Sequence, residues 1–105
     1  MFDAGPDAEG YLVMPADVGA GVFAWAYDAG ARIYSASWGA ASAGVYSGLD
    51  YQVDAYLEAH PELLLIVAAG NSGDGATAAD RAVNSPGLAK NALTVGATVS
   101  IMLVG

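Results

Sequence analysis

The stretch Leu63-Leu64-Leu65-Ile66-Val67-Ala68-Ala69, followed by Gly70-Asn71-Ser72-Gly73, decides the fold of this 105-residue chain. An uninterrupted apolar run bounded by proline and glycine is typical of a strand that is covered on both faces within a parallel sheet. The run is too short to cross a bilayer, which takes roughly 20 apolar residues. The sequence therefore predicts a central β-strand over Leu63–Ala69.

Helical and strand patterns alternate along the rest of the chain. We predict helices over Pro15–Ala29 and Leu49–Ala59, strands over Ala31–Ser37 and Ala92–Ala97, and a polar, glycine-rich connection over Gly70–Lys90. Strands that alternate with helices indicate βαβ units with right-handed crossovers. The expected fold class is α/β, with a partial parallel sheet and flanking helices, in a single partial domain over residues 1–105.

Composition and charge exclude several classes of function. The chain is 55% hydrophobic and 13% charged, as in globular proteins, and its net charge of −8 argues against nucleic acid or an anionic membrane as a partner. The sequence contains no cysteine, which excludes disulfides, thiolate metal sites and cysteine nucleophiles. Residues Met1–Gly10 carry three acids and no base, unlike a signal peptide. No cofactor and no metal are expected.

Two motifs that suggest cofactor binding or catalysis lack their context. Gly19-Ala20-Gly21-Val22-Phe23-Ala24 matches a dinucleotide-binding fingerprint, but Pro15 interrupts the strand that should precede it. Ser35-Ala36-Ser37-Trp38-Gly39 approaches a nucleophile elbow, but Ser35 stands where the tight turn requires glycine. We expect neither function here.

The titratable residues around the second predicted helix favour structural roles. His60 is the only histidine, so a serine triad could be built only around this ring. It lies between the helix end and Pro61, where a partly exposed residue that caps the last helix carbonyls is expected. Asp50, Asp54 and Glu58 are spaced four apart, which predicts a solvated face rather than a metal site.

Asn71 follows the central strand in a loop of small residues. A phosphate cradle is disfavoured because Gly70–Gly75 contains no lysine or arginine. Ligands of parallel α/β sheets bind beyond the carboxyl ends of the strands, which is where this amide is expected. From the residues alone, Asn71 is either a turn asparagine or an amide that faces a ligand.

Three blocks of the sequence resemble the subtilisin-like serine proteases, or subtilases. Val67-Ala68-Ala69-Gly70-Asn71-Ser72-Gly73 is similar to their A-A-G-N block, and Ser37-Trp38-Gly39 is similar to their S-[LW]-G substrate-binding strand. Ser85-Pro86, followed by Ala89-Lys90-Asn91-Ala92-Leu93-Thr94-Val95-Gly96-Ala97, is similar to a Y/S-P pair and the strand [KN]-V-[IL]-[TA]-V-G-A. The blocks cover about residues 30–98 in the family's order.

The resemblance implies a fold, and roles for the first two of these blocks. The fold would be an incomplete part of the subtilisin-like three-layer α/β/α sandwich. Asn71 would donate a hydrogen bond to the oxyanion of the tetrahedral intermediate. Ser37, Trp38 and Gly39 would form one wall of the pocket for the residue before the scissile bond and pair with the peptide by strand addition. The facing wall would be formed by Ala68, Ala69 and Gly70.

The catalytic blocks of the family are not in this sequence. D-[ST]-G, H-G-T and G-T-S-M-A do not occur, and Asp3-Ala4-Gly5 departs from the first of them. We therefore expect the central fragment of a serine endopeptidase whose parent binds peptide or protein substrates, and expect this chain alone to be inactive. The apolar end Ile101–Val104 agrees with a fragment that could self-associate through exposed sheet edges.

Two alternatives stay open at this point. The chain could be a non-enzymatic α/β module that binds a peptide or another ligand, or a gene fragment without function. The residues leave the compartment undecided, while the resemblance suggests a secreted parent.

Overall fold

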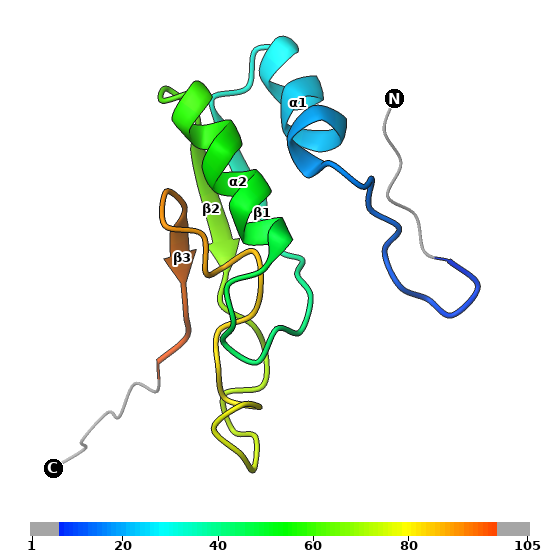
Figure 1. Ribbon diagram of the computed structural model, residues 1–105, viewed down its shortest axis with the longest axis vertical. Helices are drawn as coiled ribbons and strands as arrows, with labels where there is room; N and C mark the ends of the chain where they lie inside the picture. The colour runs from blue at the N-terminus through cyan, green and yellow to red at the C-terminus, as the bar shows by residue number, and fades with distance from the viewer. Residues whose placement is uncertain (1–6, 99–105) are drawn as a thin grey trace, which may run out of the picture.

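The computed structural model of this chain describes residues 7–98, in which three parallel strands form one sheet. In chain order the elements are the π-helical turn η1 (Gly19–Phe23), α1 (Ala24–Asp28), β1 (Ile33–Ala36), α2 (Gly48–Ala59), β2 (Leu64–Ala68) and β3 (Leu93–Val95), as drawn in Figure 1. The prediction of a partial α/β fold with a parallel sheet is confirmed. Asp3-Ala4-Gly5 and Ile101–Val104 lie outside the described residues.

The strand predicted to be central lies in the middle of the sheet. The strand order is β1-β2-β3, with Ile33 opposite Leu64 in the first pair and Ile66 opposite Leu93 in the second. Helix α2 makes the connection between β1 and β2, as parallel pairing requires. All three strands therefore end at the same edge, and Figure 1 shows the connections after β1 and β2 gathered beyond the arrowheads.

The first helical segment begins later than predicted. Regular structure starts at Gly19 rather than at Pro15, because the groups before it bond elsewhere. The N–H of Val18 donates to the Gln52 side chain at 3.1 Å, and Asp17 accepts the N–H of Ala20 at 3.2 Å, as a capping residue does. The ends of the other elements agree with prediction to within two residues.

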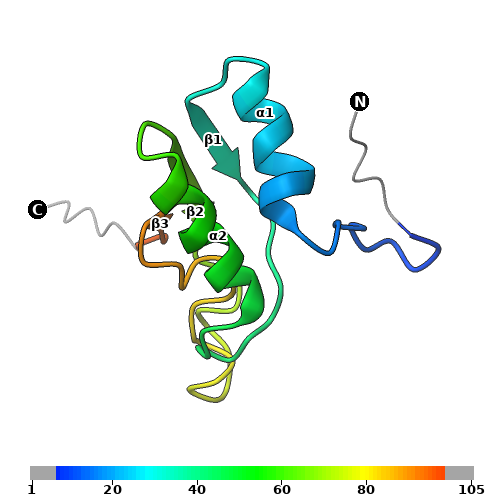
Figure 2. The same ribbon diagram turned by 45° about the horizontal axis from the view of Figure 1, so that its top comes forward.

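One face of the sheet carries the core. Leu65 and Val67 of β2 are buried against side chains of both helical segments, which lie on the same face. In Figure 2, α1 lies beside β1 and α2 beside β2. The core residues are Val18, Val22, Phe23, Ala36, Val53, Leu57, Leu63, Leu65, Val67 and Ala89.

The opposite face of the sheet is open in residues 7–98. Leu64 is 42% exposed, Leu93 51% and Ile33 65%. The prediction that Leu63–Ala69 is covered on both faces is wrong for this part of the chain, because the structure contains one helical layer of the expected sandwich. Within residues 7–98, no helix combines the length and the hydropathy needed to span a bilayer.

Candidate functional site

A cavity of about 550 Å³ lies beyond the carboxyl ends of β1 and β2. Both of the segments that carry the subtilase-like A-A-G-N and S-W-G motifs contribute to it. The lining consists of small and neutral residues: Ser37, Trp38, Gly39, Ala68, Gly70, Asn71, Ser72 and Asn84. Of the predicted site residues, only Ala69 is not part of the lining.

One wall of the cavity is the segment that follows β1. Trp38 is half-buried and packs against the core, which anchors the wall from behind. Gly39 passes so close to the Ser85 carbonyl that a Cβ atom would lie 2.6 Å from its oxygen. A side chain at this position would push the two segments apart. The backbone groups of Trp38 and Gly39 make no hydrogen bond with any other residue in the range 7–98.

The facing wall is the end of β2. The N–H of Ala69 donates to the Val95 carbonyl at 3.0 Å, and its own carbonyl accepts the N–H of Asn84 at the same distance. Ala69 thus fixes the wall through its backbone. Gly70 has a φ of +124°, in a region that side-chain-bearing residues rarely adopt, and it turns the chain toward Asn71.

Asn71 places a neutral amide at the cavity. The residue is exposed, and within residues 7–98 nothing forms a hydrogen bond with its side chain. An unengaged Nδ2–H₂ group can donate to a ligand oxygen without changing its own charge.

Asn84 also lines the cavity, although it is not among the site residues predicted from the sequence. Its Nδ2 would lie 3.0 Å from a Cβ added at Gly70, so the two residues are in close contact. The adjacent Ser85-Pro86 pair was one of the subtilase-like blocks, and it is the signal that could have drawn attention to this position. The contact itself depends on how the long connection folds back.

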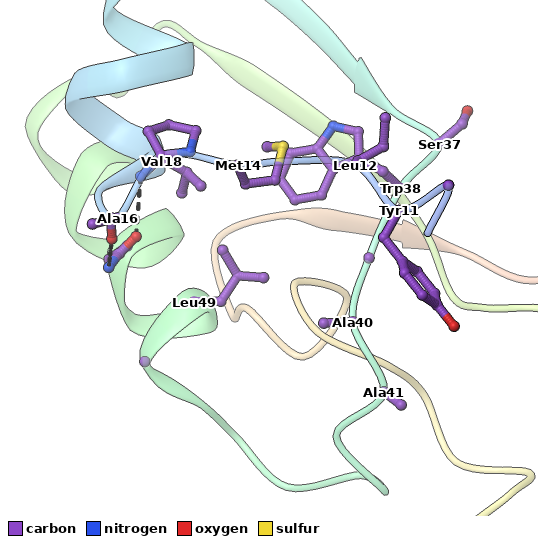
Figure 3. Close-up of a pocket in the computed structure, with 15 residues that line it drawn as sticks. Tyr11, Leu12, Met14, Ala16, Val18, Ser37, Trp38, Ala40, Ala41 and Leu49 are labelled. Atoms are coloured by element: carbon purple, nitrogen blue, oxygen red, sulfur yellow. Dashed lines mark hydrogen bonds between the residues drawn. The ribbon is translucent and has the colours of Figure 1, made fainter. Parts of the chain in front are cut away.

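A second, larger cavity lies on the other side of the Ser37–Gly39 segment. It has a volume of about 820 Å³ and is shown in Figure 3. Tyr11, Leu12, Met14, Trp38 and Leu49 are among its lining residues and give it an apolar character. The segment before η1 is held there because Gln52 bonds to Ala16 and Val18. The two cavities share one wall.

The three acids of α2 do not form the solvated face that was predicted. Glu58 is exposed, as expected, but Asp50 is fully buried and Asp54 is half-buried. The prediction is wrong for Asp50 because residue 50 lies three and seven positions before Val53 and Leu57, which places it on the buried face of the helix. A carboxylate on this face needs hydrogen bonds, and Asp50 receives them from the connection after β2.

Asp54 accepts hydrogen bonds from the same connection. Its carboxylate accepts the N–H groups of Lys90 at 3.1 Å and Asn91 at 2.8 Å, and the hydroxyl of Tyr46 at 2.6 Å. Burial raises the pKa of Asp54, but these hydrogen bonds and the Lys90 charge outweigh it and lower the pKa below its usual value. The hydrogen bond to Asp54 raises the pKa of Tyr46 to about 12.

His60 lies at the other end of the sheet from the cavity. It caps α2, and its Nδ1 is 2.9 Å from the Tyr56 carbonyl while its ring stacks on the Tyr56 ring at 4.0 Å. The predicted capping role is confirmed. Within residues 7–98 no cluster of three or more histidine or acidic residues could hold a metal ion.

Comparison with known proteins identifies the family. The model of the subtilase family, peptidase S8, matches residues 15–101. The serine protease/ABC transporter B family protein tagD of Dictyostelium discoideum is 32% identical over 101 residues, which are 92% of this chain and 5% of that protein. The related protein tagB of the same organism is 43% identical over 75 residues, 68% of this chain and 4% of its own length. The chain thus spans about a twentieth of these relatives, and it belongs to the subtilase family.

Proposed function

We propose that this chain is the central part of the catalytic domain of a serine endopeptidase, where it supplies the oxyanion donor and the walls of the substrate pocket. The observation that carries the proposal is the cavity beyond β1 and β2. Segments more than 25 residues apart in the sequence, Ser37–Gly39 and Ala68–Asn71, line it together. Each of them contains one of the motifs that resemble the subtilase substrate site.

In this proposal Asn71 stabilises the negative charge that develops on the substrate carbonyl. When a nucleophile attacks a peptide bond, the carbonyl oxygen becomes an oxyanion, and a fixed neutral donor lowers the energy of that state. The amide of Asn71 fits because it is exposed at the cavity and has no hydrogen-bond partner within residues 7–98. Because an oxyanion accepts a stronger hydrogen bond than a carbonyl, the contact favours the transition state over bound substrate.

The peptide would bind along the Ser37–Gly39 segment in an extended conformation. The free backbone groups of Trp38 and Gly39 can pair with it by strand addition. Side chains of an extended peptide alternate between its two sides. They would therefore reach the two cavities that flank this segment.

The lining of the smaller cavity suggests which side chains it accepts. None of its lining residues is charged, and a volume of about 550 Å³ leaves room for a large side chain. Burying a charged side chain without a counter-charge is unfavourable. We propose that the residue before the scissile bond is uncharged, with Asn84 and Ser72 as its polar contacts.

The nucleophile and base must come from the segments that carry H-G-T and G-T-S-M-A, which this chain does not contain. The test is to join this chain to flanking segments with the D-[ST]-G, H-G-T and G-T-S-M-A blocks, a polypeptide called the reconstituted protease below. It should cleave chromogenic peptides and be labelled by a serine-directed phosphonate, and the 105-residue chain alone should do neither. Turnover or labelling by the chain alone would contradict the proposal.

A non-enzymatic peptide-binding module is the second candidate, because the same cavity and free backbone groups fit it. Peptide binding without hydrolysis by the reconstituted protease, folded as judged by a cooperative melt, would favour this alternative.

A further inference from the structure

Asp50 is a fully buried carboxylate in the first turn of α2, and the roles proposed above leave it unused. Its Oδ2 accepts the Ser85 hydroxyl at 2.5 Å and the Ser47 N–H at 2.8 Å, and its Oδ1 accepts the Leu88 N–H at 3.1 Å. Both oxygens are therefore engaged. The first turn of a helix also favours a negative charge.

Ser85 connects this carboxylate to the cavity. Its backbone N–H donates to the Ala40 carbonyl at 3.1 Å, and its carbonyl accepts the N–H of Ala40 at 2.8 Å. The same carbonyl lies against Gly39, and the preceding residue, Asn84, lines the cavity. One residue thus contacts Asp50 through its side chain and the Ser37–Gly39 wall through its backbone.

We propose that Asp50 is a positioning residue for the substrate cavity. Asp50 holds Ser85 in place, and Ser85 in turn fixes the spacing between the Ser37–Gly39 wall and Asn84. That spacing determines how tightly the cavity binds peptides. The proposal rests on the proposed function of the cavity as a substrate pocket. Asp50 does not line the cavity, so its loss should affect substrate binding more than the chemical step.

Asp54 is a matched control on the same helix. It accepts two backbone N–H groups and one hydroxyl, which belong to Lys90, Asn91 and Tyr46, and none of these residues lines the cavity. Asp50 accepts two backbone N–H groups and two hydroxyls, the second hydroxyl being that of Ser47. Replacing either acid by asparagine removes the same charge from α2. Only the replacement of Asp50 changes a contact to Ser85.

The first measurement is amide hydrogen exchange of the 105-residue chain by NMR. Ser85→Ala and Asp50→Asn should each speed exchange at the Ala40 N–H by about tenfold relative to the Leu64 N–H, which bonds to the Arg32 carbonyl away from the cavity. Asp54→Asn should instead speed exchange at the Asn91 N–H, which donates to Asp54. Equal increases at Ala40 and Leu64 would indicate a general loss of stability and would overturn the proposal.

The second measurement separates binding from catalysis in the reconstituted protease. Ser85→Ala should raise KM about tenfold and leave kcat within about threefold, while Asp54→Asn should leave both within about twofold. A fall in kcat without a rise in KM would overturn the proposal. If the reconstituted protease without substitutions cleaves no peptide, the proposed function fails. The exchange measurement still decides whether Asp50 holds the Ser37–Gly39 wall in place.

Discussion

The two faces of the sheet have the same apolar character in the sequence and opposite environments in the structure. Leu65 is 1% exposed and Val67 is fully buried in the core, to which η1 and α2 contribute buried side chains. Their neighbours on the other face, Leu64 and Leu93, are 42% and 51% exposed. An apolar run predicts a strand that can be buried. It does not predict which other segment covers each face of that strand.

The difference matters for the candidate site. The covered face fixes the cavity, since Trp38 packs against its core and Asp50 lies on the buried side of α2. The open face contributes no residue beyond Ala68 to the cavity lining. Substitutions on the two faces should therefore separate effects on the site from effects on association.

The largest expected effect on stability is on the covered face. Leu65→Ala removes a side chain that is 1% exposed and should lower the free energy of unfolding by about 2–5 kcal/mol. Leu64→Ala, one residue away on the open face, should lower it by about 1 kcal/mol or less. Urea titration followed by circular dichroism measures both. Equal losses would contradict the description of the two faces.

The next effect concerns association. We propose that the 105-residue chain self-associates through its exposed sheet edges, where β3 presents Leu93 and Val95 at about half their full exposure. Leu93→Lys should shift the sedimentation coefficient toward that of the monomer. Ala55→Lys adds the same charge at an exposed position of α2 and should not. A compact monomer of the unchanged chain would contradict the proposal.

The smallest effect is a pH dependence confined to the helical side of the molecule. The hydrogen bond to Asp54 raises the pKa of Tyr46 to about 12, above the value of about 10 for a free tyrosine. The contribution of this hydrogen bond to stability is fully present below about pH 10 and is lost as the pH rises through about 12. Asp54→Asn should return the pKa of Tyr46 toward that of free tyrosine, measured by NMR titration with Tyr46→Phe for assignment. An unchanged pKa would show that Asp54 is not the cause.

Much of the fold could be predicted because it depends on local patterns. The strand and helix periods and Pro61 after the second helix placed the elements to within a few residues. Leu63–Ala69 could not reveal that only one of its faces is covered, since that depends on which segments pack against it. The start of η1 was missed because Gln52, far along the chain, bonds to Val18.

The residues of the candidate site were selected from motifs rather than from periodicity. Motifs that resemble a known family identified Ser37–Gly39 and Ala68–Asn71, and the structure brings them to one cavity. The resemblance gave no role to Asp50, Ser85 or Asn84. Their contacts join α2, Gly70 and the long connection between β2 and β3. No local sequence pattern predicts how that connection folds back against the other two.

The most direct test of the proposed role of Asn71 is Asn71→Ala in the reconstituted protease. We predict that kcat falls by about 10²–10³, a magnitude taken from the loss of an oxyanion donor in a subtilisin, while KM changes by less than about twofold. Asn84→Ala, at the same cavity, should instead change KM and side-chain preference. If Asn71→Ala leaves kcat within about threefold of the parent, a loss of under roughly 0.7 kcal/mol, Asn71 is not the oxyanion donor.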